Sequence, residues 1–212
     1  MSGLSSYQFD KNGSKVYIFG VVKGLVSGAD KLEKKVKKLE FEIGGLPISE
    51  EEKKGLKEFI ESDDIETEVE PSTPEKAYAE KLQKFGEVSL PPPSYTFFMK
   101  YCLENDIEIE PLDMDEEHYT MAYCDHVTGV QWIHQALREK GLRRKKIEAE
   151  NPAEFANEWD HFINKLKGFQ KLEAHREEVM AKNIDRISAR GNMVVLLEEE
   201  RIEGVWNRLN ER

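Results

Sequence analysis

Cysteine is scarce in this sequence, and long hydrophobic runs are missing. Cys102 and Cys124 are the only cysteines in 212 residues, so no disulfide framework is indicated and a reducing, cytoplasmic location is expected. No apolar run approaches the roughly 18 residues of a membrane-spanning helix, so we predict no membrane span. The first residues also lack a basic segment followed by an apolar one, and therefore predict no signal peptide.

The standard catalytic and cofactor motifs are absent as well. The sequence has no GxGxxG, GxxxxGK(S/T), HExxH or GxSxG pattern. Its histidines are widely spaced. His126 and His134 are eight residues apart, whereas two metal ligands on one helix face are typically four apart. The sequence therefore predicts no resident metal and no other cofactor.

Positive charge is in the minority. The chain has 31 Lys and Arg against 42 Asp and Glu, a net charge of −11, which argues against general nucleic-acid binding and against anionic membrane surfaces. One basic run, at residues 143–146, could form a local patch, although the solvated end of a helix is the favoured interpretation. A hydrophobic content of 39% with 34% charged residues indicates a folded, heavily charged protein.

What the sequence does contain is the alternation of strands and helices that is typical of α/β proteins. Strands are predicted at residues 16–22, 39–45, 65–69, 107–112 and 193–197. Helices are predicted at residues 29–38, 50–60, 75–85, 95–104 and 115–140, in two stretches between 152 and 188, and around 205–209. We therefore predict a single α/β domain over residues 1–212. Its sheet is small, mainly parallel or mixed, with four to five strands flanked by helices, and it carries a helical insertion at about residues 114–188.

Aromatic residues recur at helical spacing within this insertion. Phe155, Trp159, Phe162 and Phe169 form an apolar stripe within residues 152–188. The favoured interpretation is that the stripe belongs to the core of the same molecule. The alternative is a helical scaffold that forms a homo-oligomer through this face.

Charged residues gather where the predicted strands end. In open α/β sheets, ligands bind at the carboxyl ends of the strands. Here those ends supply Lys23, Glu40 or Glu42, Asp113, and Glu199 to Arg201. Lys23 could hold an anionic group beside a helix N-terminus, and a glutamate could act as a general base. The alternative is a self-neutralising ion network in which Lys23 and Arg201 face the carboxylates.

Five short segments carry a resemblance to a known family. They are Tyr17-Ile18-Phe19-Gly20-Val21-Val22-Lys23-Gly24, the strand 39–42, residues 107–113, His175-Arg176-Glu177-Glu178-Val179-Met180-Ala181, and Arg201-Ile202-Glu203-Gly204-Val205. Together they resemble the TraB and Tiki group, within the wider fold shared with erythromycin esterases and ChaN haem-binding proteins. The resemblance implies G-x-x-H-type elements at two strand ends together with a glutamate and an arginine. In the Tiki branch this set implies a metal-dependent protease.

Cations stand at both positions where the resemblance implies metal-binding histidines. The first position falls on Lys23, at the end of Gly20-Val21-Val22-Lys23, and the second on Arg201. The implied glutamate corresponds to Glu40 or Glu42, and the implied arginine to Arg176. The chain therefore resembles a diverged member that lacks the metal-site histidines.

A divalent metal at this place would meet two positive side chains instead of two neutral imidazoles. The resemblance thus implies a site in which Lys23 and Arg201 replace the charge of the metal and pair with Glu42 and Glu200. Two functions follow as expectations. One is a non-catalytic or diverged cytoplasmic TraB-like protein that binds a small anion or a peptide at the charged strand ends. The other is a hydrolase with a glutamate base and cationic anchors.

Overall fold

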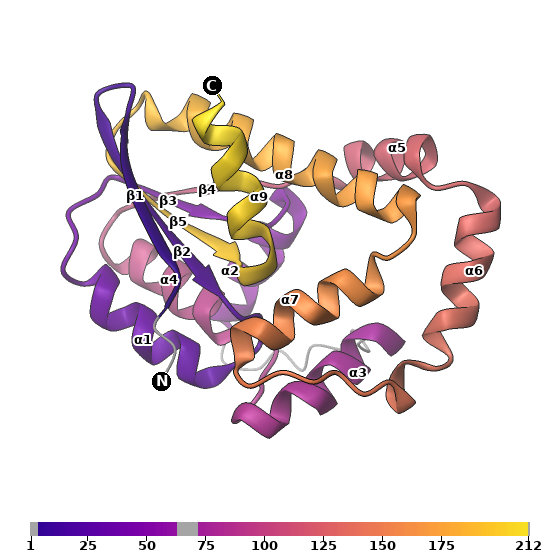
Figure 1. Cartoon of the computed structure of the whole chain (residues 1–212). Helices are drawn as coiled ribbons and strands as arrows, with labels where there is room; N and C mark the ends of the chain where they lie inside the picture. The colour runs from indigo at the N-terminus through magenta and orange to yellow at the C-terminus, as the bar shows by residue number, and fades with distance from the viewer. Residues whose placement is uncertain (1–3, 63–71, 212) are drawn as a thin grey trace.

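The computed structural model describes residues 4–62 and 72–211. In this part of the chain, one mixed five-stranded sheet is flanked by helices, which confirms the predicted α/β class (Figure 1). The strands are β1 Ser6–Lys11, β2 Ser14–Val21, β3 Ile43–Leu46, β4 Glu108–Pro111 and β5 Met193–Glu198. Their order is β1-β2-β5-β3-β4, with β1 antiparallel to β2 and the other neighbours parallel. The strand predicted at 65–69 lies outside the described residues.

Helices account for most of the remaining described chain. They are α1 Val26–Val36, α2 Glu50–Glu61, α3 Thr73–Leu82, α4 Pro93–Glu104, α5 Glu116–His126, α6 Gly129–Glu139, α7 Pro152–Ile163, α8 Lys167–Ser188 and α9 Glu199–Asn210, with single 3₁₀ turns at Gln83–Phe85 and Leu142–Arg144. Within residues 4–62 and 72–211, none of these helices is both long and apolar enough to traverse a bilayer.

The two central strands are covered on both faces, which explains their unbroken apolar runs. Val16 and Ile18 of β2 lie in one core with residues of α8 and α9, whereas Phe19 and Val21 lie in a second core with residues of α1 and α4. The residues of β5 divide between the two cores in the same alternating way. Figure 1 shows the resulting layers, with α8 and α9 on one side of the sheet and α1 and α4 on the other.

Strand β1 was not predicted from the sequence. This strand pairs with β2 through a two-residue turn at Asn12 and Gly13, whose φ angles are 53° and 83°. Both residues are in the left-handed region, and Asn-Gly is the pair that most favours such a hairpin turn. The Asn-Gly dipeptide was therefore a signal from which β1 could have been predicted.

The strand predicted at 39–45 is wrong in its first half, because β3 begins at Ile43. The backbone N–H of Glu42 donates to the carbonyl of Asn192 at 3.0 Å, and the Glu42 side chain accepts from the Asn192 N–H at 2.7 Å. The alternation of Glu40 and Glu42 with apolar residues therefore belongs to a connection at the amino end of the sheet.

The chain between β4 and β5 forms helices α5 to α8. The helical run predicted at 115–140 is two helices, because the Thr128 side chain accepts from the backbone N–H of Gln131 and starts α6 afresh. Phe155 and Trp159 of α7 are buried in a cluster with Leu82 of α3. These two members of the aromatic stripe therefore belong to the core, as the favoured interpretation held.

Gly45 of β3 occupies a position without room for a side chain. An added Cβ would lie 2.6 Å from Cε of Met193 and 3.0 Å from Cδ1 of Leu112. We expect Gly45→Val to lower the free energy of unfolding by about 1–3 kcal/mol, the usual cost of overpacking a core. Urea denaturation measures this loss. Gly55→Ala in α2 is the control, because an added Cβ there meets open space and should raise helix stability by up to about 1 kcal/mol. Equal losses in the two variants would contradict the prediction.

Candidate functional site

The carboxyl ends of the parallel strands lie at one edge of the sheet. Val21, the last residue of β2, lies beside Glu198, the last residue of β5, and β3 and β4 end side by side as well. After β2 the chain turns at Gly24, whose φ of 88° favours glycine, and this turn leaves Lys23 at the edge. Since α9 follows β5 without a gap, Arg201 in its first turn lies at the same edge.

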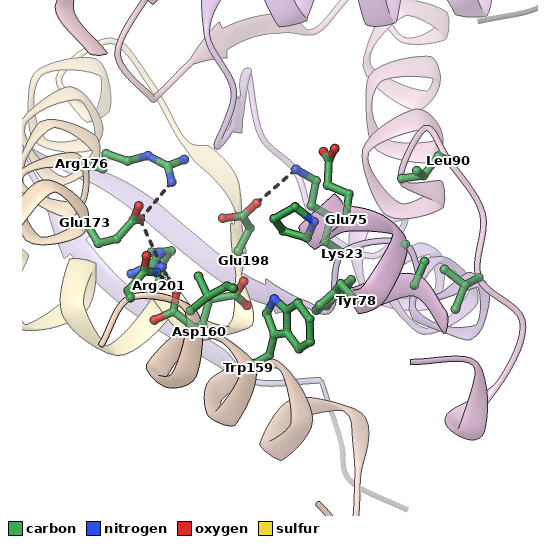
Figure 2. Close-up of a pocket in the computed structure, with 17 residues that line it drawn as sticks. Lys23, Glu75, Tyr78, Leu90, Trp159, Asp160, Glu173, Arg176, Glu198 and Arg201 are labelled. Atoms are coloured by element: carbon green, nitrogen blue, oxygen red, sulfur yellow. Dashed lines mark hydrogen bonds and ion pairs between the residues drawn. The ribbon is translucent and has the colours of Figure 1, made fainter. Parts of the chain in front are cut away.

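A cavity of about 320 Å³ opens at this edge (Figure 2). Four of the residues predicted to form a site line it together: Lys23, Arg176, Glu200 and Arg201. They come from the turn after β2, from α8 and from α9, so the fold brings together side chains that are far apart in the sequence.

Lys23 is the most exposed of the three cations, with 41% of its side chain accessible against 20% for Arg176 and 6% for Arg201. Its Nζ lies 3.7 Å from Oε1 of Glu198. Burial alone would raise the pKa of Glu198, but the positive charge of Lys23, followed by that of Arg176, outweighs it and holds this pKa below its ordinary value. Glu198 is therefore a buried, ionised carboxylate at neutral pH.

Arg201 is the centre of an ion network formed with two helices. Its guanidinium pairs with Asp160 of α7 and, on α8, with Oε2 of Glu173 at 3.1 Å and Oε1 of Glu177 at 3.3 Å. Glu177 also pairs with Arg208 at 2.7 Å. Each charge in this group has an opposite partner, so the network balances the positive charge of the arginines against the negative charge of the acids.

Arg176 extends the network to the end of β4. It pairs with Asp113, which lies two residues after the last residue of β4. Its Nη1 donates to Oε2 of Glu173 at 2.9 Å. Glu173 therefore bridges Arg176 and Arg201, as the dashed lines in Figure 2 show. Asp113 does not line the cavity and acts on it through Arg176.

Glu200 behaves in the opposite way to Glu198. Burial, followed by the negative charge of Glu198, raises the pKa of Glu200 to about 8. Its Oε2 is buried and has no hydrogen-bond partner in the described part of the chain. Glu200 is therefore a protonated carboxyl group at neutral pH, two residues from an ionised one.

The wall of the cavity facing these charges is largely apolar. Tyr78 of α3 and Trp159 of α7 lie with their ring centroids 5.7 Å apart in an edge-to-face arrangement, and both point into the cavity in Figure 2. Further apolar lining residues are Pro74, Ala79, Val88, Leu90 and Ile163. Tyr78 Oη is buried without a hydrogen-bond partner among the described residues, and burial raises the pKa of this hydroxyl.

A second cavity, of about 310 Å³, also contains the Lys23–Glu198 pair in its lining. It shares Lys23, Glu198 and Arg176 with the first cavity and is lined by Tyr95 and Leu56 as well. Burial raises the pKa of the Tyr95 hydroxyl, which also has no hydrogen-bond partner in the described chain. The Lys23–Glu198 pair therefore lines both cavities.

The structure does not bring every predicted residue to this edge. Glu40 and Glu42 precede β3 and lie at the opposite, amino end of the sheet. Glu199 turns toward β1, where its Oε1 accepts from the Ser5 hydroxyl at 2.5 Å. The predicted ion pairs with Glu42 and Glu200 are also not formed, because Lys23 pairs with Glu198, and Arg201 with acids of α7 and α8.

Sequence reasoning missed five residues that shape the cavity: Tyr78, Trp159, Asp160, Glu173 and Glu198. Glu198 directly follows the apolar run of β5, so the strand-end argument could have included it. Glu173 lies three residues before Arg176 on α8, one turn away on the same helix face. The residues of α3 and α7 gave no local signal, because their place depends on tertiary packing.

No family model matches this chain, and no curated protein matches it either. Within residues 4–62 and 72–211, no group of three or more His, Cys, Asp or Glu side chains is placed to hold a metal ion. At the two positions where the TraB resemblance implies metal ligands, Lys23 pairs with Glu198 and Arg201 lies in the ion network with α7 and α8.

Proposed function

We propose that this protein is a diverged, TraB-like cytoplasmic binding protein whose cavity holds a small peptide-like molecule with free amino and carboxyl groups. The observation that supports it is a set of three buried polar atoms without a hydrogen-bond partner in the described chain. They are Tyr78 Oη, Glu200 Oε2 and Arg201 Nε, all on residues that line the cavity. Buried polar groups are ordinarily paired. Three unpaired polar groups at one cavity therefore favour a polar ligand that forms hydrogen bonds with them.

The charge of the lining favours a peptide-like ligand over a small anion. The acidic lining residues are Glu75, Asp160, Glu173, Glu198 and Glu200, and the basic ones are Lys23, Arg176 and Arg201. Both arginines are held by carboxylates within the protein, whereas Lys23 is more exposed and meets Glu198 at the long distance of 3.7 Å. Lys23 is therefore the cation that can bind a ligand carboxylate, while the ionised Glu198 attracts an amino group.

The apolar wall supplies the third element of such a site. Tyr78 and Trp159 present aromatic surface opposite the charged floor (Figure 2). Ligand sites commonly combine an apolar wall with a few polar groups that fix orientation. An aliphatic side chain of the ligand would lie against this wall while the charged groups hold its two ends.

Leucyl-leucine is expected to raise the melting temperature of the protein, because a ligand that binds only the folded state stabilises it. N-acetyl-leucyl-leucine amide, which lacks both terminal charges, should have no such effect.

Tyr78→Phe should weaken dipeptide binding several-fold, since one hydrogen bond contributes about 1 kcal/mol. Tyr123→Phe is the matched control, because Tyr123 lies on α5 against Phe169 and lines no part of the cavity. Thermal shift and titration calorimetry measure these effects.

Two outcomes would overturn the proposal that the ligand is peptide-like. One is an equal shift with the charged and the blocked dipeptide. The other is a shift with inorganic phosphate alone, which would favour the small anion.

Peptide hydrolysis is a second candidate, favoured by the opposite pKa shifts of Glu198 and Glu200. Carboxyl groups whose pKa values are pushed apart can serve as a general base and a general acid. Ionised Glu198 would take a proton from a water molecule while the oxygen of that water bonds to the peptide carbonyl carbon. Protonated Glu200 would give its proton to the amine nitrogen as the C–N bond breaks. Chromatography of the dipeptide after the titration separates the two candidates: free leucine supports hydrolysis, and intact dipeptide supports binding.

A further inference from the structure

Helix α6 is inverted relative to an ordinary surface helix, which turns its apolar side to the core. Its large apolar residues face solvent, with exposed fractions of 65% for Val130, 57% for Trp132, 52% for Ile133 and 58% for Leu137. Its buried residue is polar, Gln135, at 6%. Figure 1 shows α6 at the outer edge of the molecule, away from the sheet.

Polar contacts hold the inner side of α6 in place. Arg138 donates to Oε1 of Gln135 at 3.1 Å and to the carbonyl of Phe162 in α7, and its guanidinium lies 4.9 Å from the centre of the Phe162 ring. Gln131 packs closely against Gly168 of α8. A Cβ added to Gly168 would lie only 2.4 Å from Oε1 of Gln131. The orientation of α6 is thus fixed by specific contacts, and the apolar side is left outside.

Val130, Ile133 and Leu137 are spaced by three and four residues, so they form one seam along α6. This is the spacing by which two helices pack against each other through a shared apolar seam. Trp132 on another face of α6 and Met121 of α5 are also exposed, at 57% and 58%. Exposed large apolar side chains gathered in this way mark an interaction surface more often than an inert one.

The charges at the two ends of α6 are opposite in sign. Before it, Asp125 in the last turn of α5 is acidic and exposed. After it, Lys140 and the run 143–146 are basic and exposed. An antiparallel copy of the same helix would place acidic against basic charge at both ends at once. The surface is therefore complementary to itself, as an interface about a two-fold axis requires.

From the seam and these charges we infer that α6 is the interface of a homodimer, in which it packs antiparallel against α6 of a second copy of this chain. In a pair centred on Ile133, the two Ile133 side chains meet at the axis. Lys140 then lies opposite the end of the partner's α5, near the partner's Asp125. The cavity described above is on another part of the molecule, so this inference is independent of the proposed function.

An anionic membrane is the main rival occupant, since an exposed apolar helix followed by basic residues also suits lipid. The net charge of −11 opposes this, and the exposed Asp125, just before α6, would be repelled by an anionic surface. A second copy accounts for the acidic end and the basic end together, whereas lipid accounts only for the basic one.

Sedimentation across ~1–100 µM, the range of weak dimers, is expected to show the wild type moving from 24.5 kDa toward twice that mass. Ile133→Glu should be monomeric throughout, because it places two like charges at the axis. Leu103→Glu is the matched control: it puts the same charge on an exposed leucine of α4 and should leave the dimer intact. Circular dichroism should show the same helix content in all three proteins.

A charge-exchange pair tests the antiparallel arrangement itself. Lys140→Glu and Asp125→Lys should each weaken the dimer severalfold, and the double variant should restore it. A wild type that stays monomeric would overturn the inference. So would an Ile133→Glu protein that still dimerises, or binding of monomeric wild type to phosphatidylcholine–phosphatidylserine vesicles, which would assign the surface to lipid.

Discussion

Replacing Arg201 with methionine is expected to lower the free energy of unfolding by about 3–5 kcal/mol, the cost of removing one partner from a buried ion pair. The guanidinium is buried and is shared by Asp160, Glu173 and Glu177. Methionine fills much of the same volume but leaves these carboxylates facing one another. Because native domains are stable by only about 5–15 kcal/mol, the variant should unfold at a much lower urea concentration.

Arg190→Met is the matched control for this prediction. Arg190 also pairs with two carboxylates, Glu108 and Glu110, but it is exposed at the opposite end of the sheet. Exposed ion pairs are screened by water and contribute little, so its urea midpoint should hardly move. A double variant, Arg201→Met with Asp160→Asn, should recover part of the loss, because Asp160 has no other cationic partner among the described residues and one unpaired charge is removed. Equal losses for Arg201 and Arg190 would show that burial does not govern the network.

The parts of the fold that were predictable depend on local pattern. β2 and β5 were predicted within one or two residues because continuous apolar runs are specific to strands covered on both faces. The start of α2 followed from the Ser49 and Glu52 capping box, which the structure shows with both of its hydrogen bonds. The strand ends then indicated where Lys23 and Arg201 would lie.

The parts that were not predictable depend on tertiary packing. Alternation around Glu40 and Glu42 predicted a strand face, but a side-chain hydrogen bond to the Asn192 backbone fixes a connection instead. The periodicity of the sequence predicts an apolar face on α6 but does not predict whether this face lies toward the core or toward solvent. Contacts of Gln135 and Arg138 hold α6 with its apolar face toward solvent. The acid partners of Arg201 come from α7 and α8, whose approach to α9 no local pattern encodes.

Glu200→Gln is expected to make the protein more stable than the wild type at alkaline pH and to leave it unchanged near pH 4. The pKa of Glu200 is raised from its ordinary value of 4.5 to about 8. Between these values the folded state keeps a proton that the unfolded state has released, so the wild type loses stability as pH rises through this window. Glutamine mimics the protonated carboxyl and escapes the loss, which amounts to several kcal/mol at about 1.4 kcal/mol for each pKa unit.

Glu198→Gln should show the opposite sign, which makes it the decisive comparison. The pKa of Glu198 is held below its ordinary value by Lys23, so its carboxylate contributes stability above that value and the contribution disappears as pH falls. The Glu198→Gln protein should therefore be less stable than the wild type at neutral pH and approach it in acid.

Urea denaturation of the three proteins between pH 4 and pH 9 measures both differences. Parallel profiles for all three would mean that neither carboxyl is perturbed, which would remove the acid–base pair and, with it, the hydrolytic alternative at this site. Diverging profiles would show that two glutamates separated by one residue hold opposite protonation states, the property that hydrolysis at this cavity requires.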